Sequence, residues 1–450
     1  MDMISFIRKN IIVPLGLKTA RIPYKYVPLI GGIYSREART IDIYESLGAE
    51  EKREFIFSKM YSLVKYAVEN IPFYRDYYAK CGFSLTDLKS FDDISSIPII
   101  NKKMLMECPL ERRSANIRGR YVANTGGSSG HPLTFYRTKD SRIREMAYMH
   151  RIWAKLGYKK SALKLQFTGR STMDTPLRYD LSVNTIVADV YKPFGQTVEA
   201  LEVFPEKISY LHGYPSAVYE FALYCREKGI SGSTMFKNLS GAFLSSEYPY
   251  PYFRDVIESV FGIDTISWYG HTEVCVLAYE KNEKYVYNPF QSYGYAEAVK
   301  NDVDSKYRLI GTSYYNMASP LIRYDTEDSI DDMVLTDGIL SSFTIKDGRS
   351  GQFITDMTGK NIPLTGLIFG RHHALFEYCS HIQLCQREKG EALVLYTALG
   401  MLPENFRAEE YFDVSNVDIK FNFKKIDNPV KTPAGKINLL VRPEDLSALK

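Results

Sequence analysis

The stretch that says most about this 450-residue chain is Asn124-Thr125-Gly126-Gly127-Ser128-Ser129-Gly130-His131-Pro132. It combines glycines with hydroxyl side chains, and the β-type residues 121–123 and 133–136 flank it. The pattern predicts a turn between two strands, where glycine supplies backbone freedom. Successive turned N–H groups form an anion-binding concavity, and hydroxyls add donors for phosphate oxygens. The stretch is therefore either a flexible Gly/Ser loop or a phosphate cradle, and alone it does not decide between the two.

Two common phosphate-binding loops are excluded. A Walker loop requires a Gly-Lys-Ser/Thr triplet, and none follows this stretch. A dinucleotide-binding fingerprint requires G-x-G-x-x-G at the opening of a helix, and neither the spacing nor the context fits. If the stretch binds phosphate, it belongs to another class.

Length and composition indicate a globular protein of two or three domains, each large enough for its own core. The hydrophobic content of 45% and the charged content of 24% are ordinary for a soluble chain. The net charge of +4, without a run dense in Lys and Arg, argues against nucleic-acid binding.

Residues 1–40 predict a basic N-terminal arm. They carry seven Lys and Arg residues against two acids, and their apolar run at 11–15 is too short to span a bilayer. Pro14 interrupts that run and no cleavage site follows, so no signal peptide is predicted. We expect the arm to pack on its own domain; the alternative is a weak contact with an anionic membrane face.

The six cysteines are scattered without a C-x-x-C pair, which favours reduced thiols in a cytoplasmic protein. If residues 379–385 form a strand, Cys379, His381 and Cys385 share a face that suits a metal. Their spacing matches no zinc pattern, so an ordinary strand face is the favoured interpretation and metal binding the alternative.

Apolar periodicity predicts helices that alternate with short strands, which indicates α/β architecture. Asn101 is a plausible helix cap. Turns are predicted at 211–216 and at the acid-rich 319–328. The helices are predicted at 50–70, from Tyr74, 141–157, 217–227 and 252–261, and the strands at 163–168, 239–244, 264–269, 393–396 and 417–423.

Several short stretches, each weak alone, occur in an order that resembles the adenylate-forming ligases. Within these, the chain is most similar to the phenylacetate–coenzyme A ligase group, including its CapK-like members of capsular polysaccharide biosynthesis. The stretches are residues 70–75, 97–102, the loop at 125–132, 212–216, Tyr269-Gly270-His271-Thr272-Glu273, 323–328, Gly348-Arg349 and Gly435-Lys436.

The resemblance implies a large N-terminal adenylation domain, residues 1–347, built of β-sheets flanked by helices. A small, mobile α+β lid domain, residues 348–450, follows a hinge near 347–352. It also implies an AMP-forming acid–thiol ligase that uses ATP, Mg²⁺ and coenzyme A. Adenylation needs cations and hydrogen-bond donors rather than a base, because a carboxylic acid is already ionised near pH 7.

The resemblance also assigns roles to individual residues. Lys436, Thr272 and Glu273 are expected to be catalytic, and Glu273 also to ligate Mg²⁺, which prefers oxygen donors. The expected contacts to ATP are Thr125, Gly126, Gly127, Ser128, Ser129, Gly130, Ser246, Glu247, Tyr269, Gly270, Asp328 and Arg349. The acid pocket is expected to include Tyr214, Phe243 and His271, which favours an aromatic or a short, partly polar acid.

Departures from the family pattern leave alternatives open. Pro132-Leu133 stands where many family loops have Pro-Lys, which we interpret as typical of this branch. Only Cys275 follows closely where some members bind zinc, so no such zinc is predicted. Gln352 stands where the family often has an acidic or basic hinge residue, so the energetics of the hinge stay open. The final acceptor is coenzyme A or an amine such as an aminosugar of a surface polysaccharide, and a catalytically silent nucleotide-binding protein is the remaining alternative.

Overall fold

The computed structural model describes residues 15, 18, 20–22, 26–28, 30–125, 133–167, 175–190, 192–202, 208–301, 306–345, 353–359, 361–368, 373–415, 417–431 and 437–448. These residues divide into two compact units. The first unit draws on Met1–Ala20, Lys160–Thr265 and Lys346–Lys450, and the second on Arg21–Lys159 and Ile266–Ile345.

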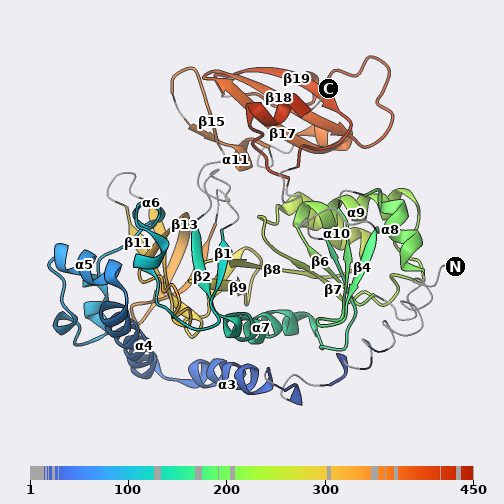
Figure 1. The fold of residues 1–450 in the computed structure, drawn as a ribbon. Coiled ribbons are helices and arrows are strands. Elements are labelled where there is room, and N and C mark those ends of the chain that lie inside the picture. Colours follow the sequence, from blue (N-terminus) through green and yellow to red (C-terminus); the bar gives the residue numbers. More distant parts are fainter. Residues whose placement is uncertain are drawn as a thin grey trace. The chain divides into compact units, whose positions relative to one another are not determined.

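The helices of the second unit come from its N-terminal part (Figure 1). They are α3 (Gly31–Ser46), α4 (Ala49–Asn70), α5 (Pro72–Lys80), α6 (Lys102–Glu107) and α7 (Lys139–Trp153). In α4, Met60, Leu63 and Val64 are among the side chains buried at three- and four-residue steps, which gives the helix one apolar face. Burying each such side chain contributes about 1.5–3 kcal/mol. Pro72 ends α4 and opens α5, because proline lacks the N–H that a helix interior needs.

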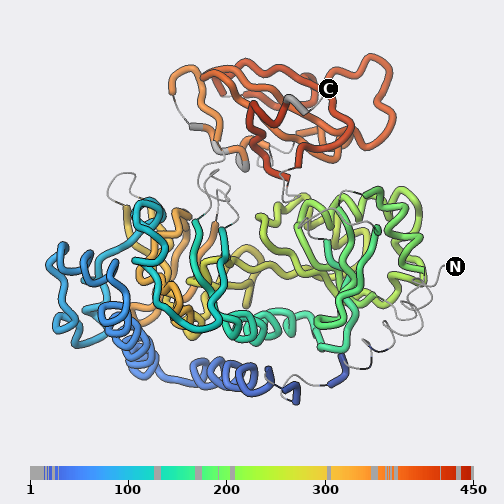
Figure 2. The backbone as a smooth tube through the Cα atoms, in the orientation of Figure 1, coloured from blue at the N-terminus to red at the C-terminus, as the bar shows by residue number. Residues whose placement is uncertain are grey.

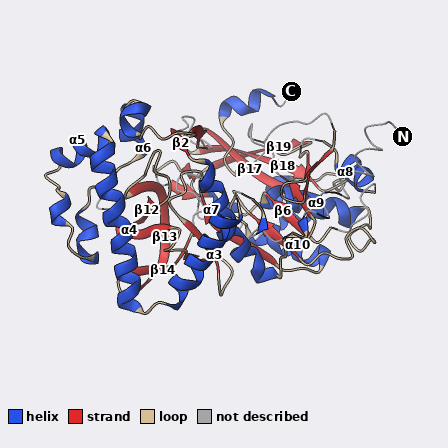
Figure 3. Ribbon diagram, turned by 60° about the horizontal axis from the view of Figure 1, so that its bottom comes forward, coloured by secondary structure: helices blue, strands red, loops and turns tan. Residues whose placement is uncertain are grey.

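Helices α3 and α7 lie side by side in the second unit, as Figures 1 and 3 show. Arg144 of α7 pairs with the buried Glu37 of α3, and Arg151 reaches Asp42 and Glu45. Two arginines of one helix therefore bind acids of the other, which fixes how the two helices align.

The sheet of the second unit is antiparallel at every pairing, in the order β11-β12-β13-β14-β10-β9-β8. Its strands are β8 (Thr265–Gly270), β9 (Leu277–Glu280), β10 (Val286–Pro289), β11 (Gly294–Lys300), β12 (Tyr307–Ser313), β13 (Tyr324–Thr336) and β14 (Ile339–Thr344). A separate hairpin pairs β1 (Tyr121–Asn124) with β2 (Thr134–Arg137).

In the first unit, a mostly parallel sheet has the order β7-β6-β3-β5-β4, with only β4 antiparallel to its neighbour. Helices α9 and α10 pack against each other beside it (Figure 1). The elements are β3 (Lys164–Phe167), β4 (Leu177–Asp180), β5 (Thr185–Ala188), α8 (Phe194–Leu201), β6 (Tyr210–Gly213), α9 (Pro215–Glu227), β7 (Gly241–Leu244) and α10 (Pro251–Phe261).

The C-terminal strands of the first unit form a second sheet, traced in orange and red in Figure 2. In it β17 pairs antiparallel and β19 parallel with the central β18. Its strands are β17 (Cys379–Glu388), β18 (Glu391–Ala398) and β19 (Lys420–Ile426), and before them β15 (Phe353–Thr355) and β16 (Asn361–Pro363) form a separate two-stranded sheet followed by α11 (Leu364–Ile368).

Most predicted elements are confirmed within a few residues, and the predicted α/β class with a large, helix-flanked, sheet-rich region is correct. Asn101 caps α6 by accepting a hydrogen bond from the Met104 N–H at 3.0 Å. The turn predicted at 211–216 is wrong, because residues 211–213 end β6 and 215–216 open α9. Of the turn predicted at 319–328, residues 319–323 are irregular, whereas 324–328 belong to the long strand β13.

The predicted division into residues 1–347 and 348–450 stays a prediction, since the predicted hinge near 347–352 lies outside the described residues. No helix in the described part of the chain is both long and apolar enough to cross a membrane.

Candidate functional site

The opening Gly/Ser stretch lies between the two strands of the β1–β2 hairpin, as the sequence predicts. Its base is closed by Thr125. The Thr125 N–H donates to the Leu133 carbonyl at 3.0 Å, and the Leu133 N–H donates to Thr125 Oγ1 at 2.9 Å. The Asn124 side chain accepts a further hydrogen bond from Thr134 at 2.8 Å. The ends of the loop are thus held together, while residues 126–132 lie outside the described residues.

Strand β8 ends at Tyr269-Gly270 and delivers the next predicted site residues in sequence. The Tyr269 hydroxyl donates to Asp328 Oδ2 at 2.5 Å, which joins two predicted ATP contacts that are 59 positions apart. Burial and the neighbouring carboxylate of Asp328 hold the pKa of Tyr269 well above its ordinary value. The Tyr269 hydroxyl therefore keeps its proton near neutral pH and donates a hydrogen bond to Asp328.

Asp328 lies at a β-bulge between β12 and β13. Ser329 and Asp325 pair with Arg308 and Ile310, so residues 326–328 face Leu309 alone. The Thr326 hydroxyl donates to the Leu309 carbonyl at 2.7 Å, and Glu327 has a positive φ of 64°. Bulges re-aim side chains, and here the bulge coincides with the Asp328–Tyr269 contact.

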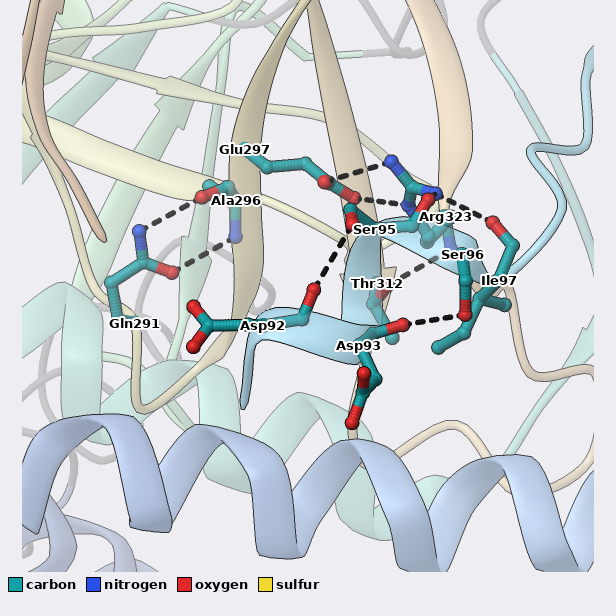
Figure 4. A network of polar contacts seen from close by, with 10 residues as sticks. All are labelled: Asp92, Asp93, Ser95, Ser96, Ile97, Gln291, Ala296, Glu297, Thr312 and Arg323. Carbon is teal, nitrogen blue, oxygen red and sulfur yellow. Dashed lines mark hydrogen bonds and ion pairs between the residues drawn. The ribbon is translucent and has the colours of Figure 1, made fainter. Parts of the chain in front are cut away.

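Arg323 fixes the chain just before β13 through a buried network (Figure 4). Its guanidinium binds Glu297 of β11 through Nε and Nη2, at 2.7 and 3.0 Å. Nη1 donates to the carbonyls of Ser95 and Ile97, at 2.5 and 2.6 Å. The network anchors the start of the strand that carries Asp328.

His271 and Glu273 follow β8 directly. His271 Nδ1 lies 3.2 Å from Glu273 Oε2, and both side chains are 13% exposed. Among the described residues, the buried His271 Nε2 has no hydrogen-bond partner. Glu273 offers the oxygen donor that Mg²⁺ prefers, which fits its predicted role. Thr272 is half-buried between the two residues.

In the first unit, the predicted pocket residues lie near the ends of β6 and β7. Phe243 is fully buried and stacks on Tyr210, with ring centroids 4.7 Å apart. Tyr214 is 7% exposed and its N–H donates to the Phe167 carbonyl at 3.2 Å. Gly213, at φ +152°, lies so close to β3 that a Cβ there would meet the Phe167 carbonyl oxygen at 2.1 Å. Glycine at this position thus lets β6 approach β3.

Glu247, predicted to contact ATP, binds backbone amides. Its Oε2 accepts from the Ser216 N–H in the first turn of α9, and its Oε1 accepts from the Ile437 N–H, each at 3.1 Å. A carboxylate at a helix N-terminus is favoured by the helix dipole. The neighbouring Ser246 has a positive φ of 68°.

The sulfur and imidazole groups of β17 do not share one site. Cys379 packs in the core of the α9 and α10 region, whereas Cys385 packs in a separate small cluster with Leu395 and Ile426. His381 packs edge-to-face on Tyr219, 5.4 Å between ring centroids. Within the described residues, no group of three or more His, Cys, Asp and Glu side chains is arranged to hold a metal.

The remaining predicted site residues lie outside the described residues: Gly126, Gly127, Ser128, Ser129, Gly130, Arg349 and Lys436. Sequence reasoning missed Glu297, the partner of Arg323, and the part-buried pair Glu220–Lys431, whose Nζ–Oε2 distance is 2.9 Å. These partners lie 26 and 211 positions apart, so no local pattern could have indicated them.

The chain matches no protein-family model. It is 22% identical to protein CapK of Staphylococcus aureus over 321 residues, which cover 68% of this chain and 69% of CapK.

Solved structures are similar over nearly the whole chain. One is 2-hydroxyisobutyryl-CoA ligase in the postadenylation state with R3-HIB-AMP, with a TM-score of 0.67, 17% identity and coverage of 90% of this chain and 92% of that one. Another is the GH3.15 acyl acid amido synthetase, with a TM-score of 0.60, 11% identity and coverage of 91% and 95%. These likenesses confirm the resemblance to CapK and to the adenylate-forming ligases: the chain has the fold of that superfamily.

Proposed function

We propose that the protein is an AMP-forming ligase that activates a carboxylic acid with ATP and transfers the acyl group to the thiol of coenzyme A. The observation that carries this proposal is the 2.5 Å contact between Tyr269 and Asp328. It joins the strand end that leads into Thr272 and Glu273 to a second polar stretch of the same fold. Two of the stretches that resemble adenylate-forming ligases therefore meet in space.

In the proposed first step, an oxygen of the substrate carboxylate attacks the α-phosphorus of ATP. The bond from that phosphorus to the bridging oxygen breaks, its electron pair leaves with pyrophosphate, and an acyl adenylate forms. No base is needed, because the acid is ionised near pH 7. The contribution of the protein is positioning and charge stabilisation.

In the proposed first step, Thr125 and the glycines that follow it bind pyrophosphate, Thr272 donates to the α-phosphate, and Asp328 accepts from the ribose hydroxyls. Tyr269 lies against adenine while its hydroxyl orients Asp328. Lys436 bridges the carboxylate and the α-phosphate, and Arg349 contacts ribose or phosphate.

Glu273 fits a role as magnesium ligand. Its carboxylate is 13% exposed, and His271 contacts one of its two oxygens at 3.2 Å. A hydrogen bond from His271 would hold the carboxylate in one orientation, as partners of metal ligands commonly do. The bound Mg²⁺ would neutralise charge on the phosphates of ATP.

In the proposed second step, the thiol sulfur attacks the acyl carbon, the bond from that carbon to the phosphate oxygen of AMP breaks, AMP leaves with the electron pair, and the thiol proton is released to solvent. The likeness to 2-hydroxyisobutyryl-CoA ligase supports coenzyme A as the acceptor. An amine acceptor is the second candidate, because the amido synthetase has a similar fold and CapK is a sequence relative. In that case the amine belongs to a surface-polysaccharide precursor. The resemblance, through Tyr214, Phe243 and His271, favours an aromatic or short, partly polar acid.

Exchange of labelled pyrophosphate into ATP tests the first step. We expect exchange that depends on an added carboxylic acid, with AMP and not ADP as the nucleotide product of the complete reaction. Glu273→Gln and Asp328→Asn should each lower exchange by about 10²-fold, whereas the exposed neighbour Glu327→Gln serves as the matched control. ADP formation would contradict the proposal.

Two further measurements separate the alternatives. Product analysis with coenzyme A against a set of amines identifies the acceptor, and efficient thioester formation excludes the amine alternative. Calorimetry with Mg·ATP tests the remaining possibility of a silent homologue. If no acid in a broad panel supports exchange and no ATP binds, the proposed activity is wrong.

A further inference from the structure

Two residues with a left-handed backbone lie just before Asp328 in the second unit. Arg323 has a φ of 46° and Glu327 a φ of 64°. A residue with a Cβ is strained in this region, so it stays there only where its surroundings hold it. We call residues 323–328 the Asp328 segment. The contacts that hold its two bends therefore set where the carboxylate of Asp328 lies.

The first bend, at Arg323, is held through the backbone. The Arg323 N–H donates to Thr312 Oγ1 of β12 at 2.9 Å, and the Arg323 carbonyl accepts from the Ile100 N–H at 3.1 Å. The Ile100 carbonyl in turn accepts from the Asp325 N–H at 2.8 Å, so Ile100 binds the chain on both sides of Tyr324. Both backbone polar groups of Arg323 are thus bonded in the left-handed conformation.

The side chain of Arg323 holds the same bend from another direction (Figure 4). Its guanidinium donates to the carbonyls of Ser95 and Ile97 and to both oxygens of Glu297. Side chain and backbone of Arg323 therefore bind one stretch of chain, residues 95–100, at separate points. The Arg323 side chain is 6% exposed, so water competes little for these hydrogen bonds.

The second bend, at Glu327, is closed within the Asp328 segment. The Glu327 N–H donates to Asp325 Oδ1 at 2.8 Å, and the Asp328 N–H donates to Thr326 Oγ1 at 3.3 Å. Asp325 is itself bound through its N–H to Ile100. The two bends thus share Asp325, and a shift at the first bend is passed on to the second and to Asp328.

From these contacts we infer that Arg323 and Glu297 are positioning residues, which hold the strained segment so that the Asp328 carboxylate meets the ribose of ATP. This inference rests on the proposed function, in which Asp328 accepts from the ribose hydroxyls. The guanidinium acts through the backbone and does not touch the nucleotide. Without its contacts, Arg323 relaxes toward ordinary φ values and Asp328 moves. The protein then loses affinity for the ribose hydroxyls rather than for the phosphates.

Binding of two nucleotides separates this role from a merely structural one. Calorimetry measures the Kd of Mg·ATP and of Mg·2′,3′-dideoxy-ATP, and the ratio of the two values reports the contribution of the ribose hydroxyls. Because both values come from the same folded molecules, a variant that only lowers the folded fraction leaves the ratio unchanged. For the wild type we expect the dideoxy nucleotide to bind about 10-fold more weakly or worse, as hydrogen bonds to a carboxylate are lost.

In Arg323→Lys and in Glu297→Gln the ratio should fall to about 3-fold or less, because neither pair reproduces the charged fork. The matched control is Arg53→Lys. Arg53 also binds both oxygens of a carboxylate, that of Asp92, whereas the bends at Arg323 and Glu327 are built without it, so the ratio should not change. A wild-type ratio in Arg323→Lys overturns the inference, even if that variant binds both nucleotides more weakly.

A milder variant keeps the guanidinium and loosens only the backbone. Thr312→Val removes the acceptor of the Arg323 N–H at nearly constant shape, and the ratio should fall about 3-fold from its wild-type value. An unchanged ratio in Thr312→Val would also contradict the inference.

Amide hydrogen exchange without nucleotide gives a readout that does not depend on the proposed activity. The Asp325 and Glu327 amides should exchange faster in Arg323→Lys than in the wild type, with Arg53→Lys unchanged. If both amides keep their protection, the inference fails even where ATP binds. If the wild type binds neither nucleotide, the proposed function fails and the inference falls with it. If it binds both equally, the positioning role alone fails, because ATP binding stands.

Discussion

Each of the two units holds an ion pair with little exposure to solvent, and the two pairs are built differently. In the second unit, Arg323 and Glu297 make two parallel contacts, and their side chains are 6% and 13% exposed. In the first unit, Lys431 and Glu220 make one contact of 2.9 Å, and their side chains are 18% and 14% exposed. The Arg323 side chain is thus less exposed than the Lys431 side chain, and the arginine pair makes two contacts where the lysine pair makes one.

The difference follows from the two cations. A guanidinium presents donors in a planar fork, so Arg323 binds Glu297 and still donates to the carbonyls of Ser95 and Ile97 (Figure 4). It joins β11, the start of β13 and the end of the 3-10 helix Phe91–Ser96. Lysine is a point charge on a flexible stem and makes fewer directed bonds. The arginine pair fixes a sheet, whereas the lysine pair ties Lys431 to α9.

The largest expected effect is the loss of Arg323. Arg323→Met leaves the carboxylate of Glu297 buried without its partner, so the free energy of unfolding should fall by about 3–5 kcal/mol. Arg323→Lys should recover only part of this loss, because an ammonium does not reproduce the fork. Urea unfolding measures both variants. A loss below about 1 kcal/mol for Arg323→Met would show that the network is replaceable.

The next effect concerns His381, which is buried beside the lysine pair in the first unit. Burial lowers the pKa of His381 to about 4 from 6.5, and Glu220 and Lys431 act on it in opposite directions. Because the folded pKa lies below the unfolded one, the neutral ring contributes stability above pH 6.5. That stability is lost as the pH falls toward 4, by roughly 3 kcal/mol in all.

The variant His381→Phe removes this titration and keeps a ring against Tyr219 and Phe253. Urea unfolding at several pH values gives the difference in stability between the wild type and the variant. That difference should shift in favour of the variant between pH 7 and 4. Carboxylates that titrate in both proteins cancel in the comparison, and a difference that stays constant with pH would contradict the prediction.

Double-mutant cycles compare the two ion pairs directly, with a smaller expected effect. For Glu297→Gln with Arg323→Met, the coupling energy should approach about 2–3 kcal/mol, and for Glu220→Gln with Lys431→Met about 1 kcal/mol. Each cycle uses unfolding of the two single variants and the double variant. A larger coupling for the lysine pair would reverse the interpretation given above.

The sequence predicted those parts of the fold whose signals are local. Apolar spacing locates α4 and α10 to within about a residue, and prolines stand at the openings of α5, α9 and α10. The prediction of a turn at 324–328 was wrong because the polar, acid-rich residues of a bulged strand resemble the composition of a turn.

The candidate site was predictable only in part. The order of short motifs indicated Tyr269 and Asp328, and the structure brings the two together. The order of motifs gave no sign of Glu220, Glu297 or Lys431. The ion-pair partner of each of these residues is distant in sequence, and only tertiary folding brings the partners together. Glu247, which the resemblance assigns to ATP, also accepts from the Ser216 and Ile437 backbone amides, and its motif gave no sign of those two partners.

The smallest expected effect tests a third kind of carboxylate contact, in which a neutral phenol replaces the cation. Tyr269→Phe removes the hydrogen bond to Asp328 and keeps the ring against Phe343. A single hydrogen bond to a carboxylate contributes about 1–2 kcal/mol, so the KM for ATP should rise about tenfold with kcat less affected. Steady-state kinetics with Asp328→Asn as the companion variant checks this. If the phenol orients Asp328 for the ribose, the two substitutions together should cost less than the sum of their separate effects, whereas additive losses would show that Tyr269 and Asp328 act independently.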